Sequence, residues 1–199
     1  MTTIDDIETL EAMFDAPSTR ALTKVARHLT PLYRQWIGAS PFCILSTVGP
    51  EGTDASPRGD DGPVVRIADD TTIWLPDWRG NHRLDSLRNI VRDGRVSLMF
   101  MVPGSDTVVR VNGRAAVTVD ADVTGAFVQR GKHPKLVVVT TVGEVYFQCA
   151  KAVTRSQLWD RSRPDGLPTP GAFLKEMEAG FDAEGYDAGY AEYAAGKMW

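Results

Sequence analysis

A series of short strand-like runs separated by turn-forming residues constrains the fold of this chain most. After Pro41 these runs are FCILSTV, TDASPR, VVRI, TTIWLP, RVSLMFMV and TVVRVNGRAAVTV. They are separated by GPEG, GDDGP, ADD, a loop followed by a helix, and PGSD. Strands this short and this closely spaced favour an antiparallel sheet or barrel over alternating strand–helix–strand units.

Helical patterns come before these strands and between them. Ile4, Ile7 and Leu10 recur at helical spacing, and two prolines divide the first 40 residues into short helices. After the fourth strand, RLDSLRNIV predicts an amphipathic helix whose apolar stripe packs on the sheet. Asn81, just before this helix, is its predicted N-cap.

The later part of the sheet region contains one more helix and a pair of strands. Asp120 is predicted to cap a helix that ends near Gln129. KLVVVTTVG and EVYFQCAK then predict a final hairpin around Gly143. TRSQLWD predicts a short helix, and RSRPDGLPTPG is a linker rich in proline and glycine.

The composition is that of an ordinary globular protein. The chain has 199 residues, 43% hydrophobic and 24% charged, which excludes a largely disordered, collagen-like or coiled-coil chain. Cys43 and Cys149 each lie in a hydrophobic run, which suits buried thiols in a reducing cytoplasm. The N-terminal sequence lacks the pattern of a signal peptide, and no apolar stretch reaches the ~18 residues of a membrane span. We therefore expect a cytoplasmic protein that does not bind membranes.

The distribution of charge is more informative than the net charge of -4, which argues against nucleic acid as a partner. An acidic tail after Pro170 carries the net charge, so the rest of the chain is balanced. The stretch from Arg58 to Arg114 contains arginine but no lysine. Arginine is preferred where a planar fork must grip phosphate or carboxylate, so this bias indicates a small anionic ligand. Pairing of the arginines with nearby aspartates on a solvated surface is the alternative.

The segment PDWRGNHRLDS carries the densest chemical signal. A predicted strand ends here in a polar loop that leads into a helix, with Arg79 and Arg83 on either side of His82. Helix N-termini expose unpaired backbone N–H groups and bind phosphate, and arginine adds charge-assisted bonds. The segment therefore indicates a phosphate site, and a capped surface helix with two solvated arginines is the alternative.

Three further positions could face a ligand. Arg58 in SPRGD precedes a glycine that allows close backbone approach, although a simple turn explains this pentapeptide equally well. Arg110 lies between valines on the long strand and is either a cleft residue or a solvent residue. Arg155 and Trp159 share a helical face with Lys151, which fits stacking on a flat ligand or a partner as well as ordinary packing.

Motifs for a protein-based nucleophile or metal are absent. The sequence has no GxSxG, HExxH, CxxC, Walker or GxGxxG motif. His28, His82 and His133 lack metal-ligand spacing with each other or with either cysteine, so no metal is expected. An enzyme of this kind would have to take its chemistry from a bound cofactor.

Together and in this order, the FCILSTVGPEG, SPRGD, PDWRGNHRLDSLRNI, RVSLMFMV, RVNGRA and CAKAVTRSQLW segments resemble the pyridoxamine 5′-phosphate oxidase-like FMN-binding split barrels. The resemblance runs from Pro41 to Trp159 and is closest to a bacterial branch of uncertain substrate. It implies a mainly β fold with flanking helices (α+β), namely a six-stranded antiparallel split β-barrel. It also implies a homodimer with FMN at the interface. The implied division is a helical segment 1–40 packed on the barrel, a barrel 41–161, and a linker with an acidic tail 162–199.

The resemblance also implies which residues contact FMN. Pro76 and Asp77 line the flavin, and the phosphate lies against Asn81, His82 and Arg83. The remaining implied cofactor-binding residues are Arg58, Arg110, Arg155 and Trp159. His82 replaces one member of the family's usual basic pair. The family's C-terminal substrate motif has no counterpart, so vitamin B6 oxidation is not expected.

The expected function is that of an FMN-dependent oxidoreductase acting on an unidentified small molecule. One FMN phosphate site without an adenine fingerprint favours FMN over FAD. A flavin-binding module without turnover is one alternative. A split barrel that binds haem or a deazaflavin is another.

Overall fold

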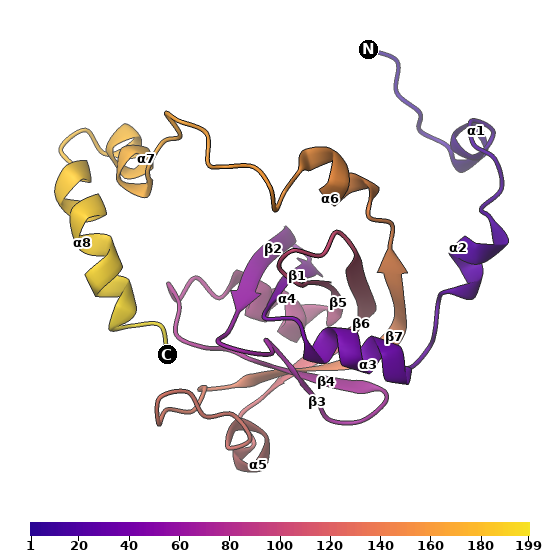
Figure 1. The fold of residues 1–199 in the computed structure, drawn as a ribbon, viewed down its shortest axis with the longest axis horizontal. Coiled ribbons are helices and arrows are strands. Elements are labelled where there is room, and N and C mark those ends of the chain that lie inside the picture. The colour runs from indigo at the N-terminus through magenta and orange to yellow at the C-terminus, as the bar shows by residue number, and fades with distance from the viewer.

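The computed structural model describes residues 1–199 and contains one antiparallel sheet of seven strands (Figure 1). The strands are β1 (Phe42–Gly49), β2 (Gly52–Gly59), β3 (Arg66–Ile67), β4 (Thr72–Pro76), β5 (Arg95–Met101), β6 (Val108–Thr118) and β7 (Val137–Gln148). Their order across the sheet is β2-β1-β5-β6-β7-β4-β3. The expected mainly β fold with flanking helices is confirmed. The expected strand number of six is wrong, because the short β3 pairs with β4 and extends that edge of the sheet.

The sheet curls so that its two ends face each other without closing. β2 forms one edge, and β4 lies next to the opposite edge. Even so, the guanidinium of Arg58 in β2 lies 2.6 Å from the carboxylate of Asp77, directly after β4. The indole N–H of Trp78 likewise donates to Asp60, just after β2, at 2.7 Å. Side chains therefore bridge the split, and the architecture is an open split barrel.

Alternating side chains of the sheet build the core inside the curl. In β1, Cys43, Leu45 and Thr47 are buried, while the residues between them are only half-buried. Phe100 in β5 and Val111 in β6 are also fully buried. This two-residue period is the one that places alternate side chains on opposite faces of a strand.

One strand differs from the sequence prediction. β7 is continuous over 12 residues, so the predicted hairpin around Gly143 is wrong. Gly143 instead lies beside a register shift between Asn112 and Gly113 of β6. A Cβ atom on Gly113 would overlap the carbonyl oxygen of Thr141. The glycines therefore allow close backbone approach at a β-bulge and do not form a turn.

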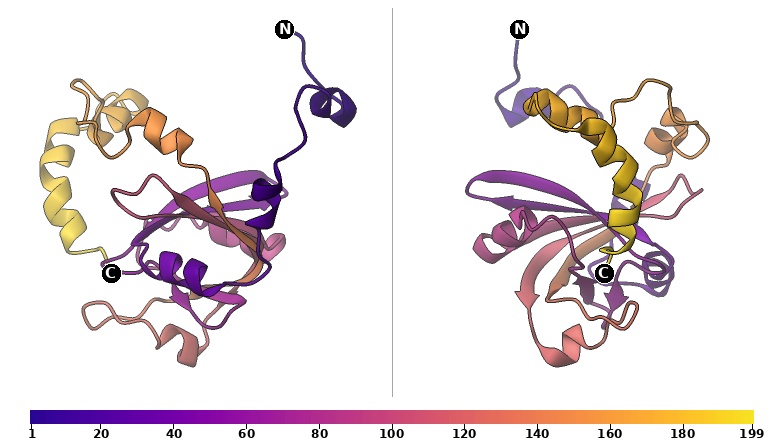
Figure 2. Two further views of the ribbon diagram at one scale, coloured as in Figure 1. Left: turned by 45° about the vertical axis from the view of Figure 1, so that its right-hand side comes forward. Right: turned by 90° about the vertical axis from the view of Figure 1, so that its left-hand side faces the viewer.

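Eight helices lie outside the sheet, and only some of them pack against it. They are α1 (Ile7–Glu11), α2 (Thr19–Thr23), α3 (Pro31–Gly38), α4 (Asp85–Arg92), α5 (Ala121–Thr124), α6 (Lys151–Ser156), α7 (Pro170–Met177) and α8 (Ala183–Ala195). α3 packs on the core through Ile37, and α4 packs there through Leu87 and Ile90. α1, α2 and α8 bury no residue. Figure 2 shows α1 and the α7–α8 arm standing away from the sheet.

The remaining local predictions have mixed outcomes. Asp120 caps α5 as predicted, by accepting from the backbone N–H of Asp122. The helix ends at Thr124, however, well before Gln129. No helix is both long enough and apolar enough to cross a membrane.

Candidate cofactor site

A cleft of about 1220 Å³ lies at the split of the barrel. Its walls are β2, the end of β4, the loop from β4 into the first turn of α4, and the loop before β7. Six of the nine sequence-predicted site residues line it. They are Arg58, Pro76, Asp77, Asn81, His82 and Arg83. Two separate segments, Arg58 in β2 and the residues from Pro76 to Arg83, thus meet at one place, because the curl brings β2 to the end of β4.

An ion pair forms part of the cleft wall. Arg58 Nη1 lies 2.6 Å from Asp77 Oδ1, and the two side chains are 20% and 21% exposed. The pair is therefore largely shielded from water, and Asp77 neutralises the charge of Arg58. The Nε atom of Arg58 is buried and has no hydrogen-bond partner. An unsatisfied buried donor costs about 1–3 kcal/mol.

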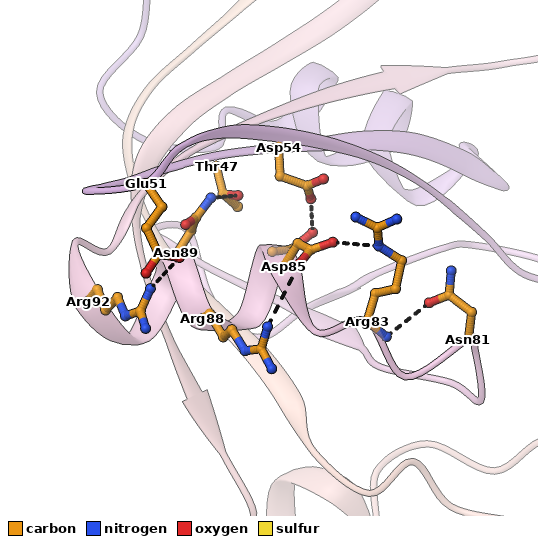
Figure 3. A network of polar contacts seen from close by, with 10 residues as sticks. Thr47, Glu51, Asp54, Asn81, Arg83, Asp85, Arg88, Asn89 and Arg92 are labelled. Carbon is orange, nitrogen blue, oxygen red and sulfur yellow. Dashed lines mark hydrogen bonds and ion pairs between the residues drawn. The ribbon is translucent and has the colours of Figure 1, made fainter. Parts of the chain in front are cut away.

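The loop from β4 to α4 is held in an unusual backbone conformation. Asn81 Oδ1 accepts from the backbone N–H of Arg83 at 3.1 Å, which forms a local turn (Figure 3). His82 and Leu84 both have φ of 62°, in the left-handed region that side-chain-bearing residues seldom adopt. Such strain is often retained at ligand sites.

The predicted N-cap at Asn81 is wrong. α4 begins at Asp85, and Leu84 occupies the N-cap position without a side-chain hydrogen bond. The reason is local, because the oxygen of Asn81 already serves the turn with Arg83. The first turn of α4 lines the cleft through Asp85, Ser86 and Leu87. Its backbone N–H groups are therefore not capped by a side chain of the preceding residue.

Polar contacts fix α4 against the β1–β2 hairpin. Ser86 Oγ donates to Asp54 Oδ2 at 2.5 Å. One turn later, Asn89 Nδ2 donates to Thr47 Oγ1 at 3.1 Å, in a buried contact. At the end of the helix Arg92 lies 2.9 Å from Glu51. Figure 3 shows these contacts along one side of α4. They hold the start of the helix at a fixed position in the cleft wall.

Cationic side chains face the cleft from two loops. Arg79 and Arg83 come from the loop before α4, and Arg83 Nε lies 2.9 Å from Asp85 Oδ2. Lys132 and Lys135 come from the loop before β7. Asp77 and Asp85 pair with Arg58 and Arg83, whereas the loop before β7 contributes no acidic side chain to the lining. The lining as a whole therefore has a small excess of positive charge, which suits an anionic ligand.

The lysines of the second wall were missed by the sequence reasoning. A signal for them exists, because no acidic residue occurs from Val123 to Gly143, whereas Arg130, Lys132 and Lys135 lie within that stretch. His133 also lines the cleft, and its Nδ1 atom lies 2.7 Å from the Phe127 carbonyl oxygen.

Three predicted site residues lie outside the cleft of this chain. Arg110 is on β6, with its guanidinium 5.6 Å from the centre of the Tyr146 ring. Arg155 is exposed on α6 and its Nε donates to the Lys151 carbonyl at 3.2 Å. Trp159 donates from Nε1 to the Ser105 carbonyl at 2.9 Å.

The expected common helical face of Arg155 and Trp159 is also wrong. α6 ends at Ser156, and Gln157 follows in a left-handed conformation that turns the chain. Trp159 is therefore no longer on the helix and lies against the loop between β5 and β6.

Neither cysteine lines the cleft. Cys43 lies opposite Arg58 in the β1–β2 pair and is buried as predicted. Burial raises the pKa of the Cys43 thiol to about 12, so it stays protonated at neutral pH. Cys149, which was expected to be buried, is exposed, because it follows the end of β7.

Comparison with known proteins identifies the family of the chain. The sequence model of the pyridoxamine 5′-phosphate oxidase family matches residues 29–149. HupZ of Group A Streptococcus has a similar fold, with a TM-score of 0.50 and 18% identity over 60% of this chain and 99% of its own. No curated protein matches the chain.

Two further solved structures are more distant. An FMN-binding protein from Syntrophomonas wolfei subsp. wolfei has a TM-score of 0.43 and 19% identity over 71% of this chain and 92% of its own. An F420 reductase has a TM-score of 0.42 and 14% identity over 56% and 94%. The family match itself covers all seven strands and the loops that form the cleft, which is more than half of the sequence. The chain therefore belongs to the pyridoxamine 5′-phosphate oxidase family.

Proposed function

We propose that this protein binds FMN in the cleft at the barrel split and is an FMN-dependent oxidoreductase acting on a small molecule. The observation that carries the proposal is one cleft lined by arginines, by the uncapped start of α4 and by the apolar and aromatic side chains of Leu75, Pro76 and Trp78. Membership of the family and the resemblance described above support the same cofactor.

The phosphate end of FMN fits the loop before α4. Arg79, Asn81 and Arg83 line this part of the cleft, and the first turn of α4 has no side-chain cap. Arginine and free helical N–H groups are the donors that proteins use for a phosphate monoester. The donors form one such group in the lining, which favours the single phosphate of FMN over the two of FAD.

The ring end of FMN fits the opposite part of the cleft. Leu75, Pro76 and Trp78 provide apolar and aromatic surface there, next to the Arg58–Asp77 pair. The Nε–H of Arg58 has no partner within the chain, and the charge of the guanidinium is already balanced by Asp77. Arg58 would therefore act on the flavin as a hydrogen-bond donor held in place by Asp77, more than as a free cation. When bound, FMN supplies hydride or electron transfer, which no side chain of this cleft supplies.

We further propose a homodimer in which a partner completes the cleft. Arg155 and Trp159, which the family resemblance implies near the flavin, lie outside the cleft of their own chain. The arms at both ends of the chain also expose large apolar side chains. They include Ile7, Phe14, Leu22, Phe173 and Tyr193. Such side chains are enriched at the centres of protein interfaces. Sedimentation of the FMN-loaded protein tests this proposal, and a monomer with FMN fully bound would contradict it.

Binding and turnover are tested in sequence. Apoprotein is titrated with FMN, FAD, riboflavin, haem and a deazaflavin, and we expect FMN to bind most tightly. Preference for haem or the deazaflavin, or no binding of FMN, would contradict the cofactor. The holoprotein is then reduced anaerobically with NADH or NADPH and reoxidised with oxygen and small electron acceptors. Turnover supports the oxidoreductase, whereas flavin that stays oxidised with every donor would make the protein a flavin-binding module.

A further inference from the structure

The chain returns to the cleft after α8. Figures 1 and 2 show α7 and α8 apart from the sheet, with the last residues coming back to it. Met198 and Trp199 line the cleft, although α8 itself buries no residue. The segment Gly196–Trp199, called the cleft cover below, therefore connects a loosely packed helical arm to the barrel.

Three side chains hold Trp199. Its indole Nε1 donates to Asp60 Oδ1 at 3.3 Å. Lys132 Nζ donates to its backbone oxygen at 2.8 Å. The guanidinium of Arg130 lies over its ring, 4.6 Å from the centre. Arg130 and Lys132 belong to the loop before β7, and Asp60 follows β2, so the cover contacts both sides of the split.

The attachment to Asp60 is the weaker part of this arrangement. The same carboxylate accepts from Trp78 Nε1 and from Gln129 Nε2, both at 2.7 Å. Asp60 therefore remains hydrogen-bonded when Trp199 leaves, and no buried acceptor is left unpaired. The bond from Lys132 is shorter and charge-assisted, but Lys132 is exposed, so water replaces the lost contact. Arg130 is exposed as well, so water can also solvate its guanidinium when the ring leaves. The cover can thus lift without leaving a buried polar group unpaired.

We propose that the cleft cover closes the candidate flavin site and must lift for FMN to bind or leave, with the bond between Lys132 and Trp199 as its clasp. The inference rests on the proposed FMN binding. A cover that closes equally well over the empty cleft and over the FMN-filled cleft slows both the association and the dissociation of FMN. Loosening it therefore raises the association and dissociation rate constants in proportion and leaves the dissociation constant nearly unchanged.

The test compares Lys132→Gln with Lys135→Gln by stopped-flow measurement of FMN binding to apoprotein. Both variants remove one positive charge from the same cleft, but Lys135 has no bond to Trp199. Relative to Lys135→Gln, we expect Lys132→Gln to raise both rate constants by about three- to tenfold, as loss of one charge-assisted bond at an exposed site allows. Trp199→Ala should raise both constants at least as much. A rise in the dissociation rate constant alone would mean that Trp199 contacts bound FMN without gating its entry. Unchanged rate constants would mean that Trp199 has no role in FMN binding. Either result overturns the proposal.

Hydrogen exchange provides a readout that needs no flavin. In apoprotein, the indole N–H of Trp199, which donates to Asp60, should exchange faster in Lys132→Gln than in Lys135→Gln. Addition of FMN to the wild type should leave this exchange at least as slow. If the wild type binds no FMN, the proposed function fails by itself, and the exchange comparison still decides whether the clasp exists. Equal exchange in the two variants would overturn the clasp even in a protein that binds FMN.

Discussion

Replacement of Arg83 by alanine should weaken FMN binding, whereas replacement of Arg88 should not. Arg83 lines the cleft at the start of α4, and Arg88 lies more than a turn further along the helix, outside the lining. Both contact Asp85, at 2.9 Å and 4.0 Å, so each variant removes one arginine and one ion-pair partner of the same carboxylate. Arg88→Ala is therefore a closely matched control.

The size of the effect follows from exposure and pairing. One charge-assisted hydrogen bond contributes about 1.5–3 kcal/mol. The Arg83 side chain is 76% exposed, and Asp85 already balances part of its charge, which places the loss near the lower limit. We expect about 1–1.5 kcal/mol, or a five- to tenfold higher dissociation constant. Arg88→Ala should change the dissociation constant by less than about twofold.

Fluorescence titration of apoprotein with FMN measures both constants. Salt provides a second check, because the screening length falls from about 10 Å at 0.1 M to about 3 Å at 1 M. The difference between the two variants should therefore shrink at high salt. Equal dissociation constants for Arg83→Ala and Arg88→Ala at low salt would show that the phosphate does not lie at the start of α4.

Two further predictions concern stability. Gly113→Ala should lower the free energy of unfolding by about 1–3 kcal/mol or prevent folding, because its Cβ atom would overlap the Thr141 carbonyl at the bulge. Gly38→Ala, where a Cβ atom meets nothing within 4 Å, should leave thermal unfolding unchanged or raise its midpoint. Hydrogen bonds and charge from Arg95 lower the pKa of Asp93 from 3.8 to about 2. The ionised pair therefore stabilises the fold above about pH 4, and this stabilisation is lost as the pH falls towards 2. Asp93→Asn should flatten the loss of stability over that interval in acid titrations followed by circular dichroism, and an unchanged acid profile would contradict it.

The sequence predicts β1, β5 and β6 well because one face of each is buried. The runs that form β1, β5 and β6 alternate in the two-residue period, and that period depends only on neighbours along the chain. The hairpin expected at Gly143 shows the limit of such reasoning. A glycine in a turn and a glycine at a bulge look alike in sequence, and only the contact with the opposite strand distinguishes them.

The candidate site was predicted in part for a similar reason. Asn81, His82 and Arg83 form one short segment, so their common location follows from the sequence alone. Lys132 and Trp199 reach the same cleft only because the sheet curls and the α8 arm returns to it. Arg110 lies outside the cleft, beside Tyr146, its partner in the β6–β7 pair. Long-range placement depends on the whole sheet and leaves little local trace.

Side chains, and not backbone hydrogen bonds, bridge the split of the barrel, which explains why a cleft can exist there. Backbone pairing of β2 with the end of β4, beyond the two residues that pair with β3, would bring the strands to about 4.8 Å and leave no space for a ligand. Here side chains make the connection, through Arg58 with Asp77 and through Trp78 with Asp60. Side-chain bridges leave the two walls further apart than backbone pairing would, and each places a polar group at the cleft. The same bridge through Asp60 also receives Trp199, so the element that keeps the barrel open is the one to which the proposed cover attaches.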